Sequence, residues 1–209
     1  MTVSKQTIFI IDDDASIRKS LSRLLRSEDY TVETFPSAEE FLRREHFDGV
    51  GCILLDVKMP GLSGIDLQEE LSKVDYHHMP IIFITGHGNI PMSVQAMKKG
   101  AVDFLTKPFN DEELLKAVRT AIGKDREERA LHAEVRKIHR RIELLSPREN
   151  EMLRYVITGM LNKEIALKLG ISEKTVKVHR GRIMEKLDVN SVAELVRLAQ
   201  MVGIEPAKK

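Results

Sequence analysis

Short apolar runs alternate with helical patterns through the first 122 residues, and this alternation restricts the fold more than any other feature of the chain. In the first helical pattern, Ile17, Leu21 and Leu25 recur at helical spacing. Five β–α repeats in about 120 residues favour a parallel sheet covered by helices on both faces. The expected strands are 7–11, 31–35, 52–56, 81–85 and 103–106, and the expected helices are 15–28, 37–45, 64–74 and 91–100.

The last third of the chain has a different pattern of apolar residues, with four short helical patterns and no segment typical of a strand. The stretch "SPREN" predicts a helix start, with Ser146 as the N-cap and Pro147 at the first helical position. Further helical patterns follow at 162–170, 173–187 and 191–201. We therefore expect a separate all-α domain of four helices.

Residues 123–143 connect these regions; they are charged throughout and contain no proline. Five apolar residues share one helical stripe, which is too short for a coiled coil: Leu131, Val135, Ile138, Ile142 and Leu145. We expect a helical connector continuous with a helix that begins near Asp111, with Gly123 as its weakest point. A solvated flexible linker is the alternative. The predicted domains are 1–122 and 144–209, joined by 123–143.

Charge is divided unevenly along the chain, although the net formal charge is only +1. Residues 1–122 hold 19 acidic and 14 basic residues, residues 123–143 hold 5 and 7, and residues 144–209 hold 8 and 12. An acidic front and a basic rear suggest two domains with different partners, and the rear domain could dock on the front one. Random drift of surface charge is the alternative.

Compartment and disulfide content follow from a few simple features. The single cysteine, Cys52, excludes an internal disulfide, and no apolar run approaches the roughly 18 residues of a membrane span. The first residues lack the basic start and apolar core of a signal peptide. These features predict a protein of the reducing cytoplasm with no membrane partner.

Polar side chains follow four of the five predicted strands. The first strand is followed by Asp12 and Asp13, the third ends in Asp56, the fourth ends in Thr85 and the fifth is followed by Lys107. All strand ends of a parallel sheet lie on one edge, so these residues are expected to converge. Three converging carboxylates resist ionising together unless a cation such as Mg²⁺ holds them.

A hydroxyl and an ammonium beside such carboxylates suit phosphoryl chemistry. Metal, lysine and hydroxyl donors neutralise the transferring group, and an aspartate can act as the nucleophile and become an acyl phosphate. Singly, an aspartate after a strand is more often a turn or cap residue, and a strand-end threonine or lysine is more often structural. Asp14 is expected to cap the helix near Ala15, and contact with the metal through water is the alternative.

Four stretches, "IIDDD", "LLDVKMPGLSG", "IIFITGHG" and "GAVDFLTKPF", resemble the receiver domain of bacterial two-component response regulators across residues 1–122. The resemblance implies a doubly wound, flavodoxin-like fold in which Asp56 accepts a phosphoryl group from a sensor histidine kinase. It also implies a Mg²⁺ ion, or Mn²⁺ or another divalent ion as a substitute, held by Asp12, Asp13, Asp56 and the backbone carbonyl of Lys58.

The same resemblance implies roles for other residues of the acidic edge. Thr85 and Lys107 are expected to contact the phosphoryl oxygens, with a cis Lys107–Pro108 peptide bond. Phe104 matches the switch aromatic of the family, which moves inward as Thr85 shifts, although a core phenylalanine looks the same in sequence. Lys58 and His87 each lie two residues after a pocket residue, so we expect them to flank the phosphoryl group and set its lifetime.

The stretch "NKEIALKLGISEKTVKVHRGRIMEKL" has the form of two helices joined by a tight turn. Ser172 is expected to cap the second helix, and Val176, Ile183 and Leu187 mark its buried stripe. Basic residues on the other face fit the DNA major groove, where they neutralise phosphates or donate to guanine edges. Basic helices alone are mostly just solvated.

Residues 145–189 resemble the LuxR-type helix-turn-helix domain of the FixJ/NarL class, and the "VHR" and "GHGNIPMSVQAMKKGAVDFLTKPF" stretches point to the FixJ branch. This implies a recognition helix at 173–187 and a dimerisation helix at 191–201. The base-facing positions are Lys177, Val178 and Gly181, and the candidate phosphate contacts are Lys174, His179, Arg182 and Lys186. Arg180 departs from the apolar residue usual in the family, so it is either buried or free to reach the DNA backbone.

Together these resemblances predict a phosphorylation-dependent transcription regulator, with activation favoured over repression. Phosphorylation is expected to promote a homodimer through residues 90–122, which then binds promoter DNA and acts with RNA polymerase. Self-phosphorylation and autodephosphorylation are the only chemistry expected of it.

Two alternatives stay open at this point. "DDDAS" also fits the D-x-D-x-S motif of aspartate-dependent phosphohydrolases, with Asp12 attacking and Asp14 as the acid/base. The other is an unphosphorylated DNA-binding scaffold with a degenerate receiver.

Overall fold

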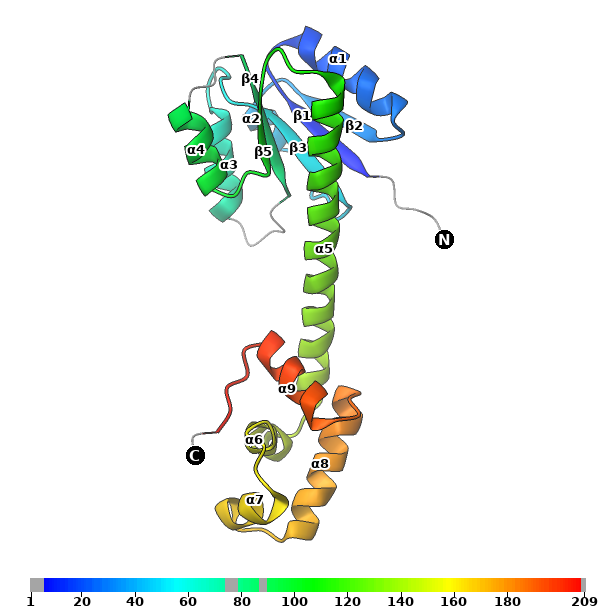
Figure 1. Cartoon of the computed structure of the whole chain (residues 1–209), viewed down its shortest axis with the longest axis vertical. Coiled ribbons are helices and arrows are strands. Elements are labelled where there is room, and N and C mark those ends of the chain that lie inside the picture. The colour runs from blue at the N-terminus through cyan, green and yellow to red at the C-terminus, as the bar shows by residue number, and fades with distance from the viewer. Residues whose placement is uncertain (1–5, 74–78, 87–89, 208–209) are drawn as a thin grey trace. The chain divides into compact units, whose positions relative to one another are not determined.

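The computed structural model describes residues 6–73, 79–86 and 90–207 (Figure 1). The chain forms two compact units, the first running to Arg129 and the second beginning at Ala130. Each unit has its own hydrophobic core, and each is treated by itself below. No helix in the described ranges is both long and apolar enough to cross a membrane.

The first unit is built on a five-stranded sheet in the order β2-β1-β3-β4-β5. All of its strand pairs are parallel. The strands are β1 (Thr7–Ile11), β2 (Thr31–Phe35), β3 (Gly51–Asp56), β4 (Ile81–Thr85) and β5 (Asp103–Thr106). The α/β prediction is confirmed, and only the third strand begins one residue earlier than expected.

The helices of this unit cover both faces of the sheet, as Figure 1 shows. They are α1 (Ala15–Ser27), α2 (Ala38–Leu42), α3 (Gly64–Lys73), α4 (Ile90–Lys98) and the first part of α5 (Asp111–Glu143). α2 is shorter than the predicted 37–45. Two residues beyond its end, the Arg44 guanidinium lies 4.7 Å from the ring centre of Phe9 and 4.4 Å from that of Phe41.

Two hydrophobic clusters result from the alternation of side chains along the strands. Ile8 and Ile10 of β1 face α1 and α5, where Leu25 and Val118 are fully buried. Phe9, on the opposite face of β1, packs in the other cluster with residues of α2, α3 and α4. The central strands are apolar on both faces because helices cover both.

α5 is a single 33-residue helix, which confirms the helical connector. Within the first unit it ends in a polar anchor. Asp125 is fully buried, and its Oδ2 accepts hydrogen bonds from the backbone N–H of Gly51 (3.0 Å) and from Nε of Arg129 (2.8 Å). Arg129 also reaches Asp48 at 3.2 Å. The start of β3 is therefore tied to α5 beyond residue 122.

The second unit is all-α in its described residues, as predicted. It contains the end of α5 together with α6 (Pro147–Val156), α7 (Asn162–Leu169), α8 (Glu173–Leu187) and α9 (Val192–Met201). Ile138 and Leu145 of the predicted connector stripe are buried in its core. Leu131, at the start of that stripe, is 56% exposed. Only the later half of the stripe is thus used for packing.

Candidate functional site

The carboxyl ends of β1, β3 and β4 place three predicted polar residues in buried positions at one edge of the sheet. Asp12 is 3% exposed, Asp56 is 7% exposed and Thr85 is 1% exposed. The parallel register pairs Asp56 with Ile84 and Thr85 with Thr106, which aligns the ends of the last three strands. The backbone N–H of Lys107 donates to the Thr85 carbonyl at 2.8 Å, so Lys107 is held directly beside this edge.

The Lys107 ammonium joins the two buried carboxylates. Its Nζ lies 2.7 Å from Oδ2 of Asp12 and 3.3 Å from Oδ1 of Asp56. These residues are 95 and 51 positions away from Lys107 in the chain, so only the fold brings them together. The Lys107–Pro108 peptide bond is cis, as predicted.

The pKa values of Asp56 and Lys107 both differ from their ordinary values. Burial raises the pKa of the Asp56 carboxyl; Lys107 lowers it, Asp12 raises it, and the net pKa lies above its ordinary value. Burial alone lowers the pKa of Lys107, but hydrogen bonds and charges from Asp12 and Asp56 reverse this, so the net pKa is raised. At Asp56, burial of the carboxyl therefore outweighs the attraction of Lys107.

Backbone donors satisfy the remaining oxygens of the pair. The Lys58 N–H donates to Oδ2 of Asp56 at 2.9 Å, and the Asp14 N–H donates to Oδ1 of Asp12 at 2.8 Å. The Lys58 side chain is exposed. His87, predicted to flank the same site, lies outside the described residues.

Asp13 and Asp14 differ from Asp12 in being exposed. Asp14 is the N-cap of α1, and its Oδ1 accepts from the N–H (2.7 Å) and the hydroxyl (2.6 Å) of Ser16, which confirms the predicted cap. A carboxylate committed to this cap speaks against the phosphohydrolase alternative, which needs Asp14 as the acid/base.

Within the described ranges, no three His, Cys, Asp or Glu side chains are grouped so that they could hold a metal ion. The structure unites Asp12 and Asp56 through Lys107 and leaves Asp13 at the exposed rim. The joint role of the three carboxylates as metal ligands stays a prediction.

Phe104 on β5 is half-buried and packs against the cluster that contains Phe83, with ring centres 6.1 Å apart. This is the position of a core aromatic at the rim of the sheet. Its role as a switch stays a prediction.

α8 carries the predicted basic face. Val176, Ile183 and Leu187 are fully buried and form its inner stripe, and Ser172 caps the helix, both as predicted. On the outer side five predicted DNA-contact residues are exposed: Lys174, Lys177, Val178, Gly181 and Arg182. The left-handed Gly170 ends α7 at φ 63°, which makes the tight turn between the two helices.

Three further residues of α8 are half-buried within the unit. Arg180 is half-buried and donates to Oδ1 of Asn162 at 2.8 Å, so it joins α8 to α7. Lys186 donates to Oε2 of Glu149 at 2.6 Å and to the Leu144 carbonyl at 3.0 Å. His179 is half-buried, and its Nδ1 has no hydrogen-bond partner among the described residues.

Glu149 is the internal partner that the sequence did not reveal. It is 3% exposed, and it closes the capping box of α6 with Ser146. The hydrogen bond from Lys186 and the backbone N–H of Ser146 lower the pKa of Glu149 to about 2. The Lys186 ammonium therefore stabilises the fold of the second unit in addition to any role toward DNA.

Comparison with known proteins agrees with both the carboxylate edge of the first unit and the helix-turn-helix of the second. The family described as "Response regulator receiver domain" matches residues 8–119, and "Bacterial regulatory proteins, luxR family" matches residues 143–199. Nodulation protein W of Bradyrhizobium diazoefficiens is 48% identical over 201 residues, covering 96% of this chain and 88% of that protein. Transcriptional regulatory protein FixJ of the same organism is 42% identical, covering 96% of this chain and 98% of that protein.

Solved structures agree as well. The response regulator StyR has a TM-score of 0.82 at 46% identity, covering 94% of this chain and 99% of that one. Full-length FixJ from B. japonicum has a TM-score of 0.57 at 41% identity, covering 97% and 99%. The chain belongs to the FixJ class of response regulators. It is a two-component transcriptional regulator with a receiver domain and a LuxR-type DNA-binding domain.

Two residues that support the receiver site of this response regulator were missed by sequence reasoning. Arg18 donates through Nη1 to the Asp12 carbonyl at 2.6 Å and fixes the main chain where β1 ends. Gly64, the first residue of α3, lies very close to the Asp56 carbonyl. A Cβ atom at this position would be only 2.2 Å from that oxygen, so the close approach requires glycine. The pattern "PGLSG" gave a signal for Gly64, whereas nothing in the sequence marked Arg18.

Replacing Gly64 with alanine is expected to shift the Asp56 backbone and destabilise the receiver domain by about 1–3 kcal/mol, in the range for overpacked sites. Thermal and urea unfolding measure the change. Gly123→Ala is the matched control. It has open space around its Cβ inside α5 and is expected to stabilise the protein by about 0.5–1 kcal/mol. Equal effects of the two substitutions would contradict the close approach at Asp56.

Glu149→Gln is expected to destabilise the DNA-binding domain by about 1–3 kcal/mol at pH 7, because it removes a charge-assisted bond to Lys186. The folded pKa of Glu149 is lowered to about 2, so its contribution is present above the ordinary pKa and is lost as the pH falls toward 2. Unfolding curves between pH 7 and pH 2 should converge for the two proteins. Lys186→Met should match Glu149→Gln at pH 7, while Lys177→Met, on the exposed face, should leave stability unchanged.

Proposed function

We propose that Asp56 is the residue that a sensor histidine kinase phosphorylates. The observation that carries this proposal is the placement of the Lys107 ammonium between the buried carboxylates of Asp12 and Asp56. A buried carboxylate beside one ammonium and one buried hydroxyl residue, Thr85, meets the requirements for an aspartyl nucleophile. A degenerate receiver would lack one of these groups, and this chain has them all.

The phosphoryl step uses the groups of this edge. An oxygen of the Asp56 carboxylate attacks the phosphorus of a phosphohistidine, the P–N bond breaks, a P–O bond forms and the imidazole of the kinase leaves. Thr85 and Lys107 donate to the phosphoryl oxygens and offset the negative charge that develops on them. Small phosphate donors would support the same transfer, and attack of water on the acyl phosphate would restore the Asp56 carboxylate and release inorganic phosphate. We propose no other chemistry for the chain.

We propose that this edge binds a divalent ion, Mg²⁺ above all, through two buried carboxylates, although no third acidic side chain is grouped with them in the described residues. Asp12 and Asp56 are buried carboxylates, burial raises the pKa of Asp56, and hard cations prefer such oxygen ligands. We propose that Asp12, Asp13, Asp56 and the Lys58 carbonyl hold the ion. When bound, Mg²⁺ supplies charge neutralisation at the incoming phosphoryl group.

The output of the protein is DNA binding as a homodimer. Phosphorylation exchanges one negative charge for nearly two at Asp56. Thr85 and Phe104 respond to this change and alter the surface of residues 90–122, on which two copies then associate. A dimer presents two recognition helices to the two half-sites of a promoter. We propose that it activates transcription through RNA polymerase.

The exposed face of α8 is the proposed DNA contact. Lys177, Val178 and Gly181 would face base edges, since all three are exposed on one side of the helix. The proposed phosphate contacts are Lys174, His179, Arg182 and Lys186. Lys186 would reach DNA only by sharing its ammonium with Glu149.

Phosphorylation is tested on the full chain with acetyl phosphate and Mg²⁺. Wild type should gain one phosphoryl group on Asp56 by mass spectrometry, and its affinity for promoter DNA should rise about 5–150-fold, the usual range of coupling between two sites. Asp56→Asn should gain neither. Asp14→Asn is the matched control, because asparagine also caps helices, and it should label like wild type. Label on Asp12, or equal DNA affinity with and without label, would contradict the proposal.

The raised pKa of Asp56 also predicts how the stability of the metal-free receiver domain depends on pH. The folded pKa is raised, so the ionised carboxylate destabilises the receiver as the pH rises from about 3.9 through the folded pKa. Asp56→Asn should therefore raise the melting temperature at pH 7 in EDTA, and this gain should shrink as the pH falls toward 4.

Adding Mg²⁺ should reverse that order. At about 100 times its Kd, a bound ion stabilises the folded state by about 2.7 kcal/mol, and the effect should be much smaller in Asp56→Asn. Scanning calorimetry of both proteins with and without Mg²⁺ gives the comparison. An equal rise in melting temperature for the two would place the ion elsewhere.

A further inference from the structure

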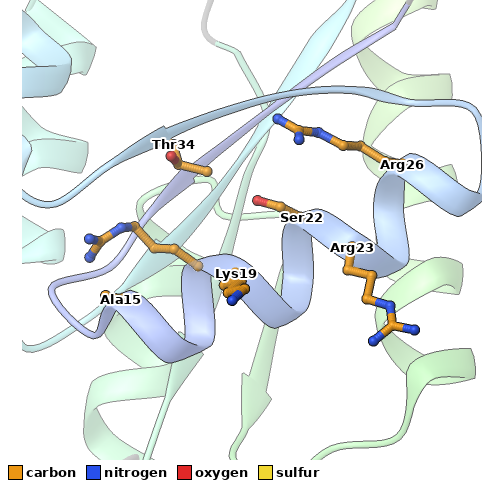
Figure 2. A pocket seen from close by; sticks show the side chains of 7 residues that line it. Ala15, Lys19, Ser22, Arg23, Arg26 and Thr34 are labelled. Atoms are coloured by element: carbon orange, nitrogen blue, oxygen red, sulfur yellow. The ribbon is translucent and has the colours of Figure 1, made fainter.

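A groove lies along α1 and reaches Thr34 of β2 (Figure 2). Its volume is about 610 Å³, and it opens to solvent. This size falls within the roughly 300–1,000 Å³ of small-molecule sites. Neither the phosphoryl chemistry nor the DNA contacts proposed above use its residues, apart from the backbone support that Arg18 gives to Asp12.

The lining of this groove is strongly basic. It includes four cationic side chains and no acidic one: Arg18, Lys19, Arg23 and Arg26. The receiver region is acidic overall, with 19 acidic against 14 basic residues in 1–122. A concentration of positive charge in a hollow of an acidic domain favours an anion there.

Two of the guanidinium groups are already fixed. Arg18 donates through Nη1 to the Asp12 carbonyl at 2.6 Å, and Arg26 donates through Nη2 to the Val32 carbonyl at 3.2 Å. Each guanidinium has five N–H donors, so most of them stay available after one bond. Side chains held in place lose less entropy when they bind a ligand.

Ser22 adds an independent observation. It is 9% exposed, and its hydroxyl has no hydrogen-bond partner in the described part of the chain. A buried hydroxyl without a partner is unfavourable, and such groups in native proteins call for an explanation. Figure 2 shows this hydroxyl pointing into the groove toward Thr34, on the same side of α1 as the Arg26 side chain.

We propose that this groove binds a small phosphorylated molecule, with its phosphate oxygens on Arg18, Arg26 and the Ser22 hydroxyl. Guanidinium groups bind phosphate with paired, charge-assisted hydrogen bonds. The Ser22 oxygen is almost closed off from solvent, so only a small group that enters the groove and displaces its neighbours could reach it, which favours a small ligand over an acidic protein surface. Lys19 and Arg23 also line the groove and add positive charge to it.

The test uses inorganic tripolyphosphate as the probe, the full-length protein and a buffer with EDTA. Calorimetry should show saturable binding of one probe molecule per chain in this groove. Amide NMR shifts should locate it at residues 15–26 and 34. Arg26→Gln should weaken this binding about tenfold or more, since it removes a charge-assisted contact.

Ser22→Ala separates ligand binding from folding, because the two effects have opposite signs. Removing a buried hydroxyl that has no partner should leave the melting temperature unchanged or higher, while the affinity for tripolyphosphate should fall several-fold. Lys174→Gln and Arg182→Gln remove the same charge from the exposed face of α8. They should leave the NMR shifts at residues 15–26 intact.

Three results would overturn the proposal. One is the absence of probe-dependent shifts at residues 15–26 and 34. Another is binding that Lys174→Gln or Arg182→Gln abolishes while Arg26→Gln and Ser22→Ala leave it unchanged. The third is a groove that takes a hexaglutamate peptide but not tripolyphosphate, which would assign it to an acidic protein segment.

Discussion

The receiver domain depends on one ammonium group held between two buried carboxylates. Asp12 and Asp56 are almost excluded from solvent, and without Lys107 their like charges would oppose the folded arrangement of β1 and β3. Burial leaves the net pKa of Asp56 above its ordinary value, although Lys107 lowers that pKa more than Asp12 raises it. The cost of burying the charge of Asp56 makes this edge receptive to a divalent ion and to chemistry on Asp56. Stability and proposed reactivity thus have a common origin in this charge arrangement.

Much of this arrangement was predictable from local sequence. Apolar runs gave all five strands, and the parallel topology then required their carboxyl ends to share an edge, which brought Asp12, Asp56 and Lys107 together. The helix caps at Asp14, Ser146 and Ser172 were equally predictable, because a cap is formed by residues within one turn. Predictions succeeded where the interaction was local or was imposed by the regular geometry of the sheet.

Contacts between distant, irregularly placed side chains were not predictable in this way. Asp125 reads as an exposed residue of a charged linker, yet it is fully buried and accepts the N–H of Gly51, 74 residues away. Lys186 reads as a phosphate contact, yet its ammonium is bonded to Glu149. Charged residues carry no periodic signal that separates a solvated position from a buried partner, so only the packed structure reveals which of them are internal.

α5 contributes buried side chains to the hydrophobic cores of both units. It begins four residues after Lys107, packs Leu114 and Val118 under the sheet, and is tied to the start of β3 through Asp125. Farther along, Ile138 is buried in the core of the second unit. The intervening stretch is polar and leaves Leu131 exposed, so it is held by helical hydrogen bonds more than by packing. The helix is therefore fixed by burial at its two ends and least supported between Arg129 and Ile138.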